Sequence, residues 1–132
     1  MRENSQGAII VEREKFEKLV EEALTELPEN FKDRLHNITV IVEEKPSREI
    51  YDRLGGSPFK LILGHYHGVP YKHRGPFYGN VAPDVITIYQ KSIEKICFTE
   101  EEIKQKVKEV VIHEIAHYFG FDDDELKKIE NQ

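Results

Sequence analysis

The chain has 132 residues, of which 39% are hydrophobic and 33% are charged, and its formal net charge is −6. This length suits one small globular domain, expected here over residues 1–132. No apolar run reaches the roughly 20 residues of a membrane-spanning helix, and a negative chain lacks the basic face usual in nucleic-acid binders. The lone cysteine, Cys97, cannot form an internal disulfide. We therefore expect a cytoplasmic protein without membrane or nucleic-acid partners.

The first expected element is an amphipathic helix over residues 11–27. Its apolar residues recur at the i, i+3, i+4 spacing that places them on one helix face, and they are Phe16, Leu19, Val20, Ala23, Leu24 and Leu27. Pro28 ends the pattern. Alternating apolar residues then predict a β-strand over residues 37–44, and a shorter apolar pattern predicts a helix within residues 46–55.

Two more strands are expected at residues 59–63 and 85–89, the second of which is rich in β-branched residues. Prolines and glycines in the segment between them predict a long loop over residues 65–84. A loop of that length in so small a domain is usually functional or mobile.

The last long helix has clear signals at both ends. Thr99 followed by Glu102 has the form of a capping box, in which each side chain accepts from a backbone amide at the helix start. The apolar pattern continues to Phe119, and Gly120 follows as a residue that adopts the left-handed turn at low cost. A short final helix is expected after the aspartates at residues 122–124.

Within that helix the sequence His113-Glu114-Ile115-Ala116-His117 has the H-E-x-x-H pattern. Histidines four residues apart share a helix face and suit the binding of one metal ion. Glu114 is about 100° around the helix from His113, beside the ion without being a ligand. There it can accept a proton from metal-activated water. The competing interpretation is a pair of ordinary helix histidines.

The pattern continues as His113-Glu114-x-x-His117-x-x-Gly120-x-x-Asp123, which roughly 1 in 10,000 chains of this composition would contain by chance. The glycine turn allows Asp123 to return to the ion as a third ligand. Aspartate is also a favoured N-cap residue, so Asp122, Asp123 or Asp124 can instead begin the final helix. The spacing favours Asp123 as the ligand.

This extended motif resembles that of the short bacterial zincin-like metallopeptidases, or minimal zincins. The resemblance includes the first helix, the strand at residues 37–43, and residues 66–70 and 83–89. It implies a small zincin-like α+β domain, with a short mixed β-sheet packed on the N-terminal helix and the metal-binding helix. It also implies one Zn²⁺ per chain held by His113, His117 and Asp123, with Glu114 as the catalytic base for hydrolysis of a peptide or protein substrate.

Two alternatives remain open beside the peptidase interpretation. One is a zinc-binding or interaction module of the same fold without hydrolytic activity. The other is an iron site, because two histidines and a carboxylate also form the facial triad of non-haem Fe(II) oxygenases; in that case Glu114 would have no role. In zincins an edge strand pairs with the extended substrate, and residues 85–89 are the candidate here.

Overall fold

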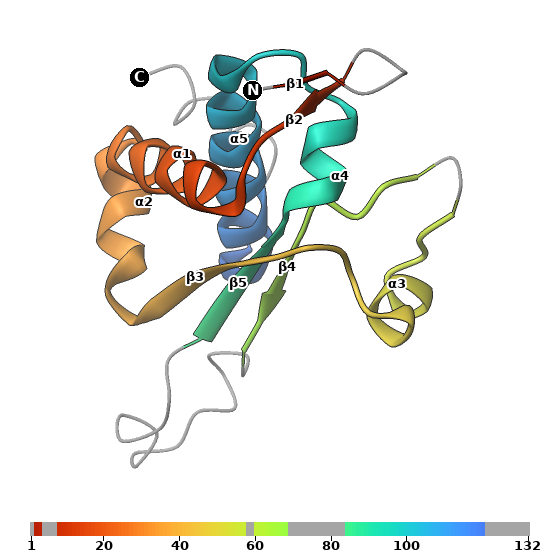
Figure 1. Ribbon diagram of the computed structural model, residues 1–132. Helices are drawn as coiled ribbons and strands as arrows, with labels where there is room; N and C mark the ends of the chain where they lie inside the picture. The colour runs from red at the N-terminus through yellow and green to blue at the C-terminus, as the bar shows by residue number, and fades with distance from the viewer. Residues whose placement is uncertain (1, 4–7, 58–59, 69–83, 121–132) are drawn as a thin grey trace.

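The computed structural model describes residues 2–3, 8–57, 60–68 and 84–120 (Figure 1). The helices in these ranges are α1 (Arg13–Thr25), α2 (Glu29–Arg34), α3 (Arg48–Arg53), α4 (Gln90–Lys95) and α5 (Glu100–Phe119), with a 3₁₀ turn η1 (Leu35–Asn37). The strands are β1 (Arg2–Glu3), β2 (Ile9–Ile10), β3 (Ile38–Glu43), β4 (Gly64–His67) and β5 (Asp84–Tyr89). No helix in the described ranges is long and apolar enough to cross a membrane.

The main sheet has three strands in the order β3-β5-β4. Strand β5 is central, parallel to β3 on one side and antiparallel to β4 on the other. Helix α5 packs against β4 and β5, and α1 packs against α5, so these two helices lie side by side against the sheet (Figure 1). The predicted α+β fold, a mixed sheet on the N-terminal helix and the H-E-x-x-H helix, is confirmed.

The core lies between α1, α5 and the sheet and includes most of the apolar positions that the periodicity singled out. Helix α1 contributes Phe16, Leu19, Val20 and Ala23, β5 contributes Ile86 and Ile88, and α5 contributes Ile103, Val107, Val111 and Ile115. Each is buried, and burying a side chain of this size contributes about 1.5–3 kcal/mol. Because these residues hold one face of α5 against the core, the opposite face of the helix points away from the core.

Both ends of α5 form as the sequence predicts. The Thr99 hydroxyl accepts from the Glu102 amide at 3.0 Å. The Glu102 carboxylate reaches back to the amide of Phe98, one residue before the cap, at 2.8 Å. At the other end Gly120 has φ +76°, the left-handed conformation that glycine adopts without a steric penalty.

The strand predicted at residues 59–63 is wrong: β4 begins only at Gly64, and His65, Tyr66 and His67 belong to it instead of to a loop. At Gly64 the strand passes close to α5. A Cβ on Gly64 would lie 2.5 Å from Val110 Cγ1 and 3.1 Å from the Thr87 carbonyl oxygen. Only a residue without a side chain allows α5 to approach the sheet this closely. Residues 69–83, the rest of the expected loop, and the expected final helix lie outside the described residues.

Strand β5 cannot be the edge strand that residues 85–89 were expected to provide, because it has a partner on each side. The edges of the described sheet are β3 and β4. Helices α2 and α4 were not predicted. Each has six residues, which leaves little hydrophobic period to identify, although the equally short α3 was predicted within residues 46–55.

The Gly64 contact gives a stability prediction. Gly64→Ala is expected to lower the free energy of unfolding by about 1–3 kcal/mol, as overpacking of a close contact does. Urea unfolding followed by circular dichroism measures the change. Val110→Ala should recover part of the loss in the double variant, because it removes the methyl that the new Cβ would meet. Strictly additive effects of the two substitutions would contradict the proposed contact.

Helices α1 and α5 are also joined by ion pairs around Glu26. Its carboxylate oxygens lie 2.9 Å from Lys104 Nζ and 2.9 Å from Lys108 Nζ. The hydrogen bond from Lys108, followed by that from Lys104, lowers the pKa of Glu26 from 4.5 to about 2.

A carboxyl group whose pKa is lower in the folded state than in the unfolded chain stabilises the folded state at pH values above its unfolded-state pKa. This stabilisation is lost as the pH falls through its folded-state pKa. Glu26→Gln should therefore be less stable than the natural chain at pH 7. The difference should shrink as the pH falls from about 4.5 to about 2, and it should be smaller in high salt because the pair is exposed. Thermal unfolding across this range measures it. Glu29→Gln, at an exposed pair with Lys32 (3.6 Å), is the matched control, and an equal pH response in the two variants would contradict the assignment.

Candidate metal centre

The three motif residues lie in the last two turns of α5, on the side away from the core. His113 and His117 are exposed and Glu114 is half-buried, whereas Ile115 and Ala116 between them are fully buried. The apolar positions of the helix therefore direct both imidazoles outward. The structure brings together the residues that the motif predicts to act together.

The His113 imidazole is oriented by a backbone hydrogen bond. The Nδ1 atom of His113 lies 2.8 Å from the carbonyl oxygen of Glu109. A carbonyl only accepts hydrogen bonds, so in a neutral ring Nδ1 carries the hydrogen and the lone pair resides on Nε2. Backbone carbonyls commonly hold a histidine ligand in this tautomer.

The distance between the rings is about 1 Å longer than a tetrahedral site for one ion requires. The ring centroids of His113 and His117 are 6.3 Å apart, with an angle of 70° between the planes. A Zn–N bond of about 2.0–2.1 Å puts a ring centroid about 3.2 Å from the ion, so two rings on one ion lie within about 6.4 Å. A tetrahedral angle brings them about 1 Å closer, which exposed side chains achieve by rotamer adjustment.

Glu114 is held by the neighbouring strand. The backbone amide of Tyr66 in β4 donates to Glu114 Oε1 at 2.8 Å. Burial raises the pKa of this carboxyl, and the hydrogen bond from the Tyr66 amide, followed by the nearby His117 and His113, opposes that rise. Among the described residues Oε2 has no hydrogen-bond partner. One oxygen is thus fixed to the sheet while the other is available for chemistry.

Tyr66 is itself fixed by contacts that the sequence did not identify. Its hydroxyl donates to Oδ2 of Asp84 at 2.8 Å, and its ring stacks on Tyr118 with centroids 4.1 Å apart. Asp84 is buried, and a Cβ on Gly68 would lie 2.5 Å from its carboxyl group. These contacts tie the strand that holds Glu114 to both β5 and α5. The sequence contained one indication that these residues matter, since Tyr66, Gly68 and Asp84 all lie in the segments that carry the family resemblance.

A cavity of about 440 Å³ opens beside the motif. Its lining includes all three motif residues, the start of β4, the apolar segment before β4 and two lysines. The lining residues are Leu54, Lys60, Leu61, Ile62, Leu63, Gly64, His65, Lys106, Glu109, Val110, His113, Glu114 and His117. Burial, then Arg53 and His67, lowers the pKa of His65, so this ring is neutral at pH 7. The cavity is large enough for a side chain next to the motif.

Asp123, the expected third ligand, lies outside the described residues. Within the described ranges no three histidine, cysteine, aspartate or glutamate side chains form a metal-binding group. The two histidines alone therefore do not complete a site, and the assignment of Asp123 stays a prediction from the motif spacing.

Known proteins similar to this chain bear on its family. A family model described as zincin-like metallopeptidase matches residues 35–132. A solved structure of a conserved hypothetical protein from Thermus thermophilus is similar, with 28% sequence identity and a TM-score of 0.52. The alignment covers 83% of this chain and 94% of that one. A search of the curated proteins finds no match.

Proposed function

The chain belongs to the zincin-like metallopeptidase family, and on this basis we propose that it is a zinc-dependent peptidase with Glu114 as its general base. The observation that supports this most strongly is the arrangement at Glu114. Its carboxylate lies beside two outward-facing imidazoles, one oxygen is fixed by the Tyr66 amide, and the group borders a cavity.

In this proposal His113, His117 and Asp123 hold one Zn²⁺. The donor set fits, since two exposed imidazoles and a carboxylate are ordinary zinc ligands. When bound, the ion would polarise the substrate carbonyl and lower the pKa of a bound water.

The protein's own contribution is proton transfer. Oε2 of Glu114 accepts the proton of the attacking water and then delivers it to the nitrogen of the departing amine. A raised pKa brings the carboxyl closer to the working pH, which improves an acid–base catalyst. The Tyr66 amide keeps the carboxylate from rotating away between the two transfers.

The substrate is expected along β4. Backbone groups alternate in direction along a strand: Tyr66 donates toward α5, whereas Leu63 accepts from Tyr89 of β5. Gly64 shares the direction of Tyr66, so its backbone amide and carbonyl face the cavity. An extended peptide can pair with this edge by β-strand addition, next to Glu114.

A peptide-library digest tests the proposed activity. The purified full chain is loaded with zinc, incubated with a mixed peptide library and examined by mass spectrometry, with the chelated chain as its control. Cleavage that depends on zinc is expected. One zinc ion per chain without any cleavage would instead support the non-catalytic module. Iron in the anaerobically purified protein would contradict the zinc assignment.

A further inference from the structure

The second edge of the sheet, β3, is open along one side. It pairs with β5, and no strand in the described ranges pairs with its other side. The carbonyl oxygen of Val42 accepts from Arg13 Nη1 at 2.9 Å, so it points away from β5. Because alternate residues share a direction, the amide and carbonyl of Val40 point to the same open side.

The pairing of β5 gives an independent check on this direction. The amide of Tyr89 donates to Leu63, on the β4 side, so Ile88 and Ile86 direct their backbone groups to β3. In the observed parallel register these groups bond with Thr39, Ile41 and Glu43. The backbone groups of Val40 and Val42 therefore point away from β5, which agrees with the hydrogen bond from Arg13 to the Val42 carbonyl.

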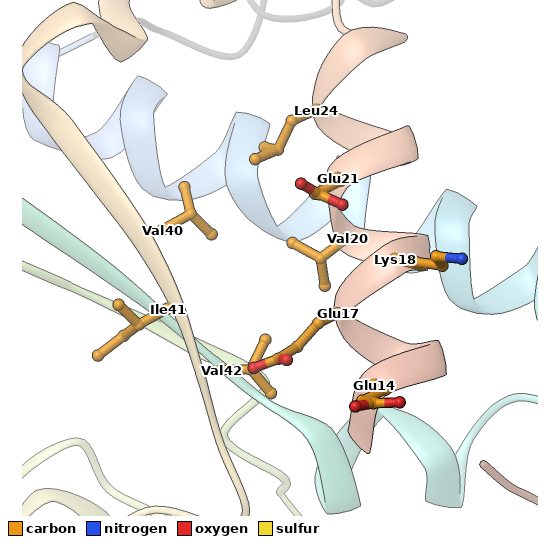
Figure 2. A pocket seen from close by; sticks show the side chains of 9 residues that line it. All are labelled: Glu14, Glu17, Lys18, Val20, Glu21, Leu24, Val40, Ile41 and Val42. Atoms are coloured by element: carbon orange, nitrogen blue, oxygen red, sulfur yellow. The ribbon is translucent and has the colours of Figure 1, made fainter. Parts of the chain in front are cut away.

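A groove of about 580 Å³ runs between this edge and α1. Figure 2 shows Val40 and Val42 directed toward Val20 and Leu24 of the helix, whereas Ile41 points away from it. Val40, Val42 and Leu24 are only half-buried, so apolar surface remains for a ligand to cover. The groove therefore combines unpaired strand edge with an apolar floor.

The rim of the groove is acidic. Glu14, Glu17 and Glu21 on α1 line it, and Lys18 is the one cation among the lining residues (Figure 2). Glu17 has a distant partner in Arg13 at 3.9 Å, with both side chains about half exposed. The chain as a whole carries a net charge of −6. A second copy would bring acidic rims together, so the charge favours a basic occupant.

We propose that the open edge of β3 and helix α1 form a docking site for an extended basic segment of a partner protein. The segment adds to β3 as a fourth strand and bonds with the amide and carbonyl of Val40 and with the amide of Val42, whose carbonyl keeps its bond from Arg13. Its side chains on the α1 side are apolar over Val20 and Leu24 and are lysine or arginine near Glu17 and Glu21. This surface is on the opposite edge of the sheet from β4, so the proposal does not depend on the peptidase activity.

The first test uses a capped nine-residue peptide that alternates lysine and valine. The protein is the full chain carrying Glu114→Gln, so that the peptide is not consumed. Amide hydrogen exchange followed by NMR is expected to slow at Val40 and Val42 on binding. A peptide with proline in place of valine has the same charge but cannot pair as a strand, and it should give no protection. Protection confined to Gly64 of β4, or equal binding of the proline peptide, would overturn the proposal.

Substitutions provide the second test. Glu17→Lys with Glu21→Lys should weaken the affinity for the lysine–valine peptide by about tenfold or more, since two attractive contacts become repulsive. Glu29→Lys with Glu49→Lys makes the same change in net charge on exposed positions of α2 and α3 and should have a much smaller effect. Equal losses in the two double variants would mean that only overall charge matters and would overturn the site.

Val40→Pro examines the strand pairing directly. Proline is tolerated at an edge position whose amide faces away from the sheet, so the variant should fold and yet lose peptide binding. Peptide binding retained by this variant would contradict the strand model. Sedimentation of the peptide-free natural chain should show no association through this surface; a dimer that Val40→Pro abolishes would assign the groove to a second copy and would also overturn the proposal.

Discussion

Glu114→Gln is expected to lower kcat/KM for peptide hydrolysis by about 10²–10⁴-fold, the usual contribution of a general base, while zinc still binds at one ion per chain. The amide has the shape of the carboxylate and its oxygen can still accept from the Tyr66 amide. It cannot take a proton from water at neutral pH, so only the chemical step is lost. Peptide turnover and elemental analysis of the same preparation measure both effects.

Glu101→Gln is the matched control for this substitution. Glu101 is exposed on the first turn of the same helix, so its replacement should leave turnover and zinc content unchanged. Turnover by Glu114→Gln at the rate of the natural chain would contradict the assignment of the base. Loss of zinc in Glu114→Gln would instead mean that this carboxylate is a ligand.

Asp123→Ala is expected to weaken zinc binding by more than about 100-fold, because it removes one of three protein ligands. Loss of a residue that only orients a ligand typically weakens binding by about 10–100-fold. Competition with a chromophoric chelator measures the affinity. Asp122→Ala and Asp124→Ala are natural controls, since they change the charge equally at adjacent positions. A large loss in either of these, with Asp123→Ala unaffected, would reassign the ligand.

Features set by local sequence were predicted well. The period of the apolar residues located α1 and α5, and the Thr99 cap and Gly120 turn gave the ends of α5. Alternation located β3, and a run of β-branched residues located β5. These elements depend on neighbouring residues along the chain, which is the information that hydrophobic periodicity carries.

Features set by contacts distant in sequence were not predicted. Strand β4 begins at Gly64, which lies close to Val110 of α5, and an apolar run at residues 61–63 offers no sign of either feature. The order β3-β5-β4 makes β5 central, which no property of residues 85–89 reveals. The link between the Tyr66 amide and Glu114 spans 48 residues, so it exists only once the sheet and α5 are packed together.

The central claim, that His113 and His117 hold one ion, is tested most directly by X-ray absorption at the zinc edge of the zinc-loaded chain. We expect scattering from two imidazole rings with nitrogen at about 2.0–2.1 Å, reduced to one ring in His117→Ala. A chain that retains no zinc, or a spectrum without imidazole scattering, would contradict the claim.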